Sequence, residues 1–312
     1  MNIYEGLDSF KRIENAVVTS GTFDGVHVGH QEILKKIKAS AEAIGGETVL
    51  ITFWPHPRHI LYPEDDSVKL LSTFEEKAEL LEKYGIDHLL KIEFTEEFSQ
   101  LSSNEFIQKV LLEKIHTRRL VIGYNHRFGR NREGSFEHLK ANSEKFGFEV
   151  EEISKQMVDH VGVSSTRIRE ALYDGEIETA SSFLGRNYSI KGLVIKGKSI
   201  GRSIGYPTAN IEVPAKWKLI PGDGTYAVKI RLGHEAYGGM MNIGYRPTVD
   251  GKTRTIEVHI FDFDSNIYDQ EIEIFFVKQL RKERKFNNLD ELREQLGKDE
   301  NEARSILDQR KI

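Results

Sequence analysis

The hydrophobic period of the sequence changes near its middle, and no other feature constrains the fold as strongly. Up to about residue 180, short runs that are apolar nearly throughout alternate with longer segments of helical period. Such runs are typical of strands covered on both faces, and helical crossovers between them imply a parallel sheet. The first half is therefore predicted to be a doubly wound, Rossmann-like α/β domain. The predicted strands span 16–21, 48–53, 88–94, 119–124 and 148–154, and the predicted helices span 30–46, 73–85, 102–116 and 135–147.

After about residue 185 the sequence becomes β-rich, with several segments of period two and glycine turns between them. This pattern predicts antiparallel pairing in a small β-barrel. A charged amphipathic helix is expected over 288–307, with Asn288 or Asp290 as its cap and Gly297 as a point of interruption. The β-rich segments are 188–197, 224–232, 254–263 and 270–281.

The chain of 312 residues is long enough for two domains, and the junction is expected within 174–187, which gives domains 1–183 and 184–312. The absence of cysteine excludes disulfides, thiolate catalysis and cysteine-ligated metal sites. The net charge of −5 gives no general attraction to nucleic acid or to an anionic membrane. With no signal-like or membrane-spanning run, a cytoplasmic enzyme or binding protein is expected, as a monomer or a weak homo-oligomer.

The stretch "TSGTFDGVHVGHQEIL" directly follows the first predicted strand. In an open α/β sheet the ligand lies beyond the carboxyl ends of the strands. Gly21, Gly25 and Gly29 let the backbone approach a ligand, and a helix that begins near His30 points its positive end into the same space. His27 and His30 could therefore donate hydrogen bonds to phosphoryl oxygens and stabilise charge during displacement at phosphorus.

Two alternatives remain open for His27 and His30. The pair could hold a metal ion, although no cysteine and no obvious third ligand accompany it, or the two could be ordinary loop residues. The G-x-G-x-x-G fingerprint is absent from this turn, which argues against hydride transfer with a dinucleotide.

The motif resembles the H-x-G-H signature of the nucleotidyltransferase superfamily, whose members transfer AMP from ATP. A second signature of that superfamily has the style "ISST-x-IR", and "VSSTRIREAL" at 163–172 is similar to it. By itself, such a serine-rich start is more often a helix cap than a ligand site. The resemblance implies that His27 and His30 are catalytic and that Arg167 reaches the ATP phosphates. The ATP-binding residues that it implies are Gly21, Phe23, Asp24, Gly29, Ser164, Ser165, Thr166 and Arg167.

Two further stretches, "TFWPHPRHIL" and "VIGYNHRFGRNREG", resemble the flavin-side loops of bacterial FAD synthetases. That family more often has "TFEPHP" and "GFDFRFGxxRxG", so this sequence departs from it at Trp54, Asn125 and His126. The alternative is a proline-stiffened turn with aromatic residues that belong to the core. The flavin-binding residues that the resemblance implies are His56, Pro57, Tyr124, Asn125 and Phe128.

"GLVIKGKS" matches the Walker A pattern, but "LVIK" continues a strand, and the "IGRSIGYPTAN" that follows contains glycine and proline where a helix should begin. The same region resembles the flavokinase signature, in which a glycine-rich loop precedes "G-[FY]-P-T-A-N". Thr208 and Asn210 face one way on an extended segment, and their oxygens suit Mg²⁺. The alternative is a turn that starts a strand. The implied ATP-binding residues are Gly197, Lys198, Gly201, Arg202, Gly205, Tyr206 and Pro207, and the implied metal ligands are Thr208 and Asn210.

In "TIEVHIF", Glu257 and His259 are expected to share one strand face, near the mouth of the barrel. A carboxylate there is costly unless it is paired or used, and the resemblance makes Glu257 the general base for a primary alcohol. The alternative is an exposed strand glutamate. "LRKERKF" is expected to form a solvated basic edge, although it could also help to draw in anionic flavin nucleotides.

The resemblance covers nearly the whole chain, and the chain is most similar to the bifunctional bacterial riboflavin kinase/FAD synthetase family. It implies phosphorylation of riboflavin to FMN, then adenylylation of FMN to FAD with release of pyrophosphate. ATP would be the co-substrate and Mg²⁺ the metal, with FMN and FAD as bound flavins. Two alternatives are a homologue that retains one activity and a flavin-binding regulator without turnover.

Overall fold

The computed structural model describes residues 1–65, 67–124, 126–153, 162–197, 201, 204–248 and 251–309, and only the backbone of 246–248, 251–253 and 309. The chain divides into two compact units, Met1–Ser165 and Thr166–Ile312. Among the described helices, none is long and apolar enough to cross a membrane.

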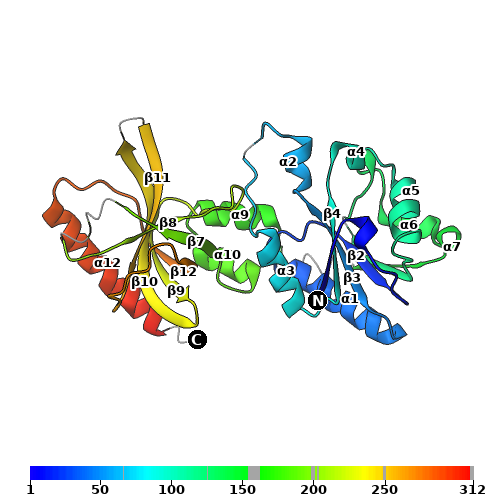
Figure 1. Cartoon of the computed structure of the whole chain (residues 1–312), viewed down its shortest axis with the longest axis horizontal. Helices are drawn as coiled ribbons and strands as arrows, with labels where there is room; N and C mark the ends of the chain where they lie inside the picture. The colour runs from blue at the N-terminus through cyan, green and yellow to red at the C-terminus, as the bar shows by residue number, and fades with distance from the viewer. Residues whose placement is uncertain are drawn as a thin grey trace. The chain divides into compact units, whose positions relative to one another are not determined.

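The first unit is built on a six-stranded parallel sheet (Figure 1). Its order is β1-β4-β3-β2-β5-β6, which confirms the predicted doubly wound α/β fold. All five predicted strands are present, and the sheet gains the edge strand β1. The strands are β1 (Asn2–Glu5), β2 (Val17–Ser20), β3 (Thr48–Trp54), β4 (His88–Glu93), β5 (Arg119–Gly123) and β6 (Glu149–Ile153).

Helices cover both faces of this sheet, as the apolar strands require. Leu34 of α1 and Leu81 of α3 pack with one set of strand residues, whereas Val110 of a π-helix and Leu139 of α6 pack with the other. The helices are α1 (Val28–Ile44), α2 (Pro57–Leu61), α3 (Phe74–Lys83), α4 (Glu96–Ser99), α5 (Ser103–Phe106), the π-helix Ile107–Leu112, α6 (Phe136–Ala141) and α7 (Ser143–Phe146), with 3₁₀ turns at Leu7–Ser9 and Arg130–Arg132.

The second unit is a closed six-stranded barrel, preceded by two helices and followed by one. Its order, β10-β11-β8-β7-β12-β9, is antiparallel throughout, as predicted. Part of the Walker A match lies in β7, which agrees with its rejection as a phosphate loop. The elements are α9 (Ser165–Tyr173), α10 (Ile177–Leu184), β7 (Ser189–Ile195), β8 (Ala209–Glu212), β9 (Gly224–Leu232), β10 (Glu235–Thr248), β11 (Gly251–Ile260), β12 (Glu271–Lys282) and α12 (Leu289–Gln309).

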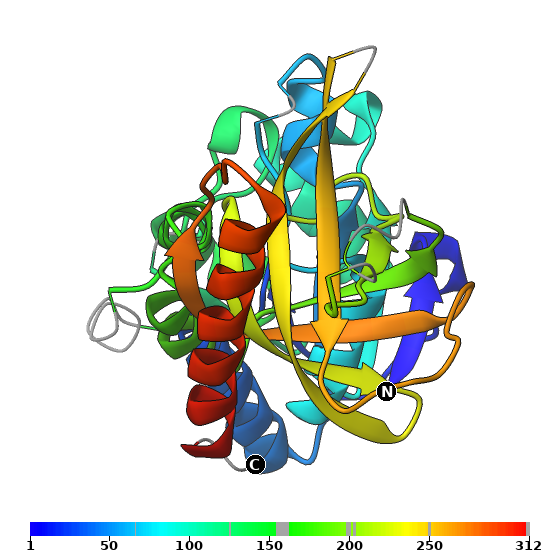
Figure 2. The same ribbon diagram turned by 90° about the vertical axis from the view of Figure 1, so that its left-hand side faces the viewer.

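Helix α12 lies along the outside of the barrel (Figure 2). Asn288 caps it, because its Oδ1 accepts the amide of Glu291 at 2.8 Å. The expected interruption at Gly297 is wrong: the helix continues through it, since contacts with the barrel hold its apolar face. The expected solvated basic edge is also wrong in part, because Arg281 of β12 pairs with the buried Asp299 of α12 at 2.9 Å.

Candidate functional sites

The loops that carry the first set of predicted residues follow β2, β3 and β5, which are neighbours in the sheet. From β2 the chain builds β3 and β4 on one side and then returns to the other side of β2 for β5. The strand order therefore reverses between β2 and β5. Ligands of open α/β sheets bind at such a point, beyond the carboxyl ends of the strands.

His27 and His30 lie together at the start of α1. His27 is the N-cap, and its Nδ1 accepts the amide of His30 at 3.3 Å. The two rings are stacked with centroids 3.6 Å apart. Because Nδ1 of His27 is an acceptor, a neutral His27 carries its proton on Nε2. Burial, followed by the electrostatic influence of His27 and Lys77, lowers the pKa of His30 well below 6.5, so His30 is neutral at physiological pH.

Asp24 anchors the turn that precedes α1. Its buried carboxylate accepts the amides of Leu71, at 2.9 and 3.1 Å, and Ser72, at 3.1 Å. Ser164 stands directly before α9, and the hydroxyl of Ser165 donates to the backbone oxygen of Asp24 at 3.0 Å. The two predicted signatures therefore meet through this hydrogen bond.

The backbone of this turn adopts conformations that non-glycine residues rarely take. Phe23 and Val26 have φ values of 45° and 38°, and such outliers are concentrated at functional sites. The ring of Phe23 lies 4.8 Å from that of His30. A Cβ at Gly21 would come within 3.1 Å of the Phe23 ring, and Gly29 is buried in the first turn of α1.

Thr166 and Arg167 begin the second compact unit and are exposed. The guanidinium of Arg167 lies 5.5 Å from the centre of the Phe183 ring. The expectation that Arg167 reaches the ATP phosphates stays a prediction.

The loop after β3 carries two of the predicted flavin residues. His56 is the N-cap of α2, where its Nδ1 accepts a backbone amide at 3.3 Å, and Pro57 is the first helical residue. Trp54, at the end of β3, packs against the core on the α1 and α3 face. This loop is therefore a proline-stiffened turn by structure, and its flavin contacts remain a prediction.

The loop after β5 carries the others. Tyr124 follows the strand directly, and Phe128 packs against the core on the other face of the sheet. Asn125 lies outside the described residues. His126 is linked to Ser20 at the end of β2 by a hydrogen bond of 3.2 Å, which joins the two sides of the switch point. Burial, and then the charge of Arg132, lowers the pKa of His126 to about 4.

In the barrel, the predicted residues lie side by side across neighbouring strands. Glu257 of β11 stands opposite Asn210 of β8 on one side and Asn242 of β10 on the other. The carboxylate accepts the hydroxyl of Thr208 at 3.2 Å and that of Thr255 at 3.4 Å. Only 9% of Glu257 is exposed, so this carboxylate is buried.

This polar row lies on the outer wall of the barrel, which corrects the expectation that Glu257 faces its mouth. Ala227 and Met240 share the face of Glu257 and pack with α12, whereas the alternate residues Met241 and Val258 are fully buried inside. Because side chains alternate along a strand, the register decides which face Glu257 takes.

The loop before β8 needs glycine for close packing of the chain on itself. A Cβ at Gly197 would lie 1.9 Å from Nδ2 of Asn210, and one at Gly201 would lie 2.1 Å from the backbone oxygen of Tyr206. Gly205 has a φ of +86°. A larger residue at any of these positions would displace the loop from the polar row or strain its backbone.

His259 holds the end of this loop. Its Nδ1 lies 2.7 Å from the backbone oxygen of Pro207, and its ring meets that of Tyr206 edge-on at 5.4 Å. Glu257 and His259 therefore contact the same segment, which confirms that they share a face. Lys198 and Arg202 lie outside the described residues.

Comparison with known families agrees with both halves of this picture. A model of the FAD synthetase family matches residues 9–167, and a model of the riboflavin kinase family matches residues 184–307. The chain belongs to the bifunctional riboflavin kinase/FMN adenylyltransferase family.

Individual relatives of this family match along nearly their whole length. The bifunctional riboflavin kinase/FMN adenylyltransferase of Haemophilus influenzae is 36% identical over 98% of this chain and 99% of its own. That of Listeria monocytogenes is 41% identical over 94% of this chain and 93% of its own. A crystal structure described as a macrolide-efflux protein from Streptococcus pneumoniae has a TM-score of 0.89 and 30% identity, with 97% of this chain and 99% of that chain covered. Its name describes that protein alone, whereas the likeness shows the same fold.

The alternative that His27 and His30 bind a metal ion requires further ligands close to them. In the described ranges, no three histidine, cysteine, aspartate or glutamate side chains gather closely enough to hold a metal.

Sequence reasoning missed several polar residues at these sites. Lys77 is buried beside the histidine turn, and Asn242 and Thr255 flank Glu257. A signal for Lys77 was available, since it falls in helical phase with the apolar residues Phe74 and Leu81. No local pattern could have predicted a role for Asn242, because it lies next to Glu257 only through the pairing of β10 with β11.

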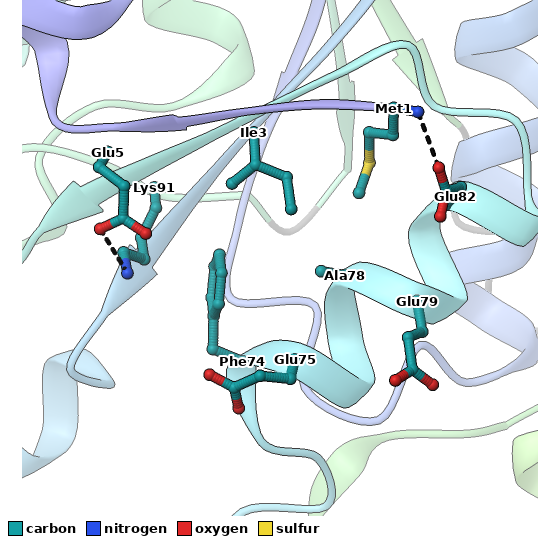
Figure 3. A pocket seen from close by; sticks show the side chains of 9 residues that line it. All are labelled: Met1, Ile3, Glu5, Phe74, Glu75, Ala78, Glu79, Glu82 and Lys91. Carbon is teal, nitrogen blue, oxygen red and sulfur yellow. Dashed lines mark hydrogen bonds and ion pairs between the residues drawn. The ribbon is translucent and has the colours of Figure 1, made fainter.

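A separate surface hollow lies between β1, β4 and α3 (Figure 3). Ion pairs border it, from the chain's amino group to Glu82 at 2.8 Å and from Glu5 to Lys91 at 2.6 Å. None of the predicted site residues lines it.

Proposed function

We propose that this chain makes FAD from riboflavin in two steps, with one step in each compact unit. The observation that carries the proposal is that each unit brings its own predicted residues together. His27, His30 and Asp24 meet at the switch point of the sheet, and Thr208, Asn210 and Glu257 meet on the barrel wall.

In the barrel, the Glu257 carboxylate takes the proton from the ribityl 5′-hydroxyl of riboflavin. The hydroxyl oxygen then attacks the γ-phosphorus of ATP, the bond to the bridging oxygen breaks, and ADP leaves. The hydroxyls of Thr208 and Thr255 orient the carboxylate through the hydrogen bonds described above.

The residues at this wall fit Mg²⁺. Thr208 and Asn210 offer hydroxyl and amide oxygens, which are ligands that this hard cation accepts. When bound, Mg²⁺ would neutralise phosphate charge next to the attacking alcohol. Thr208 donates its hydroxyl proton to Glu257, so lone pairs on its oxygen remain available to a cation.

In the first unit, a phosphate oxygen of FMN attacks the α-phosphorus of ATP, and pyrophosphate leaves. The phosphate nucleophile is already ionised, so no base is needed. Nε2–H of His27 and an N–H of the neutral His30 donate to phosphoryl oxygens while negative charge builds up. The amino-terminal end of α1 adds positive potential at the same place.

The test is to incubate the purified protein with ATP, Mg²⁺ and either riboflavin or FMN and to separate the products by chromatography. We expect FMN and FAD from riboflavin, and FAD from FMN. Formation of only one product from its own substrate would favour a homologue with one activity. Flavin binding without turnover in either reaction would favour a regulator.

A further inference from the structure

Lys77 of α3 is buried where an amphipathic helix normally places an apolar residue. Only 2% of it is exposed, and it shares the buried stripe of the helix with Phe74, Ala78 and Leu81. A buried ammonium is costly unless nearby groups compensate its charge and its three donors. The surroundings of Lys77 therefore need an explanation.

Those surroundings satisfy Lys77 only in part. Its Nζ donates to Oγ1 of Thr52 at 3.2 Å and lies 5.3 Å from the centre of the Trp54 ring. The ammonium has three N–H donors, and it makes one hydrogen bond to the described residues. The negative charge of Asp24 favours the ammonium, but burial outweighs it and lowers the pKa of Lys77 to about 8.

A second unsatisfied group lies in the same neighbourhood. Nδ1 of His30 is buried and has no hydrogen-bond partner among the described residues. Lys77 and His30 are close enough for the charge of Lys77 to lower the pKa of His30. Two incompletely paired buried groups need an explanation, and here both lie beside the turn that is proposed to hold the ATP phosphates.

We propose that Lys77 is a positioning residue for adenylyl transfer. Its ammonium supplies a fixed positive charge beside the histidine turn, and this charge acts on the ATP phosphates through Asp24 and His30. This inference rests on the proposed adenylyl-transfer function of the first unit. The charge is preorganised in a buried, weakly screened place, where it stabilises phosphoryl charge without reorganisation. Lys77 itself neither gains nor loses a proton during the step.

The test compares Lys77→Met with Lys83→Met, which removes an exposed lysine from the same helix. FAD formation from FMN is measured from about pH 6.5 to about pH 9.5, and FMN formation from riboflavin in the same sample reports the other unit. We expect Lys77→Met to lower kcat of FAD formation roughly 10²-fold, with KM for FMN within about threefold of its original value. Lys83→Met should change neither activity.

The pH profile separates this role from a merely structural one. In the unaltered protein, kcat/KM for ATP should fall above about pH 8, because kcat/KM reports groups of the free enzyme and Lys77 loses its charge there. The ionisable groups that face Lys77 are Asp24 from the turn and His30 from α1, with His27 stacked on it, while β3 presents Thr52 and Trp54. Carboxylates and imidazoles ordinarily titrate below about pH 7.5, so the decline belongs to Lys77 and should vanish in Lys77→Met.

Two results would overturn the proposal: a Lys77→Met rate within about threefold of the original, or an unaltered protein whose kcat/KM does not fall over the alkaline range. If Lys77→Met fails to fold, the profile of the unaltered protein decides alone. An unaltered protein that makes no FAD from FMN at any pH would instead remove the proposed adenylyl-transfer function, and this inference with it.

Discussion

In the first unit the candidate residues stand on loops that follow parallel strands, whereas in the barrel they stand on or directly beside the strands. The histidine turn is held by the Asp24 carboxylate, which accepts the backbone amides of Leu71 and Ser72, and it contains two non-glycine residues with positive φ. The barrel row is held by strand register, which places Asn210, Glu257 and Asn242 next to each other. A loop site therefore depends on supporting residues from other elements, and a strand site depends mainly on its own members.

The largest effect that this comparison predicts is that of Glu257→Gln. The amide keeps the shape but cannot accept the proton, so FMN formation should fall roughly 10²–10⁴-fold. FAD formation from supplied FMN should be unchanged, because that chemistry lies in the other unit. The two initial rates are measured on one sample. Riboflavin phosphorylation within a few-fold of the original would remove Glu257 from the mechanism.

His30→Ala should give the reverse pattern. Loss of one preorganised donor to a developing phosphoryl charge typically costs on the order of 10²–10³ in rate, so FAD formation should nearly disappear while FMN formation survives. The same pair of assays measures it. Equal loss of both activities would indicate that the substitution disrupts the fold of both units. Metal analysis would then test for a structural ion.

The difference between the loop site and the strand site should be largest when a residue that supports the site residues is replaced. Ser72 accepts the amide of Gly25 at 3.1 Å, so Ser72→Ala removes this buried hydrogen bond and should slow FAD formation roughly tenfold. Thr225 donates to Asn242 at 3.3 Å in the barrel row. Thr225→Val should slow FMN formation less than about threefold, because the register still positions Glu257. Equal effects in the two units would contradict the comparison.

The smallest effect on activity is expected from separating the units. Fragments 1–183 and 184–312 should each fold, and 184–312 should still make FMN, since the polar row lies entirely within it. The fragment 166–312 is the matched control, because it keeps the α10 residues Ile177 and Ala180, both buried. Loss of this cover should lower the melting temperature of 184–312 by on the order of 10 °C. A folded but inactive 166–312 would show that the kinase site needs the first unit.

Local patterns predicted most strands, but β1 and β10 were missed, and β8 was expected only as an extended segment around Thr208 and Asn210. Buried apolar runs identified five strands of the parallel sheet, but β1 carries almost no apolar run and is an edge strand. Strand β10 was missed because Gly238 and Gly239 break its alternation. A Cβ at Gly239 would lie 2.7 Å from the backbone oxygen of His259, and one at Gly238 would lie 3.0 Å from Leu307 of α12. Glycine is therefore required at these positions by close contacts with residues that are distant in sequence.

The sequence by itself determined the two-part fold, the position of the histidine turn at the end of a strand, the start of the last helix near Asn288 or Asp290 and the grouping of Thr208 with Asn210. Each of these depends on periodicity, capping or spacing over a few residues, and such local rules act before the chain is packed. Only the tertiary structure decided that Lys77 lies buried beside His30, that Asp24 is anchored by the amides of Leu71 and Ser72, and that Glu257 faces outward between Asn210 and Asn242. The physical reason is that strand register and the choice of neighbouring residues arise from contacts between distant segments, which no local pattern encodes.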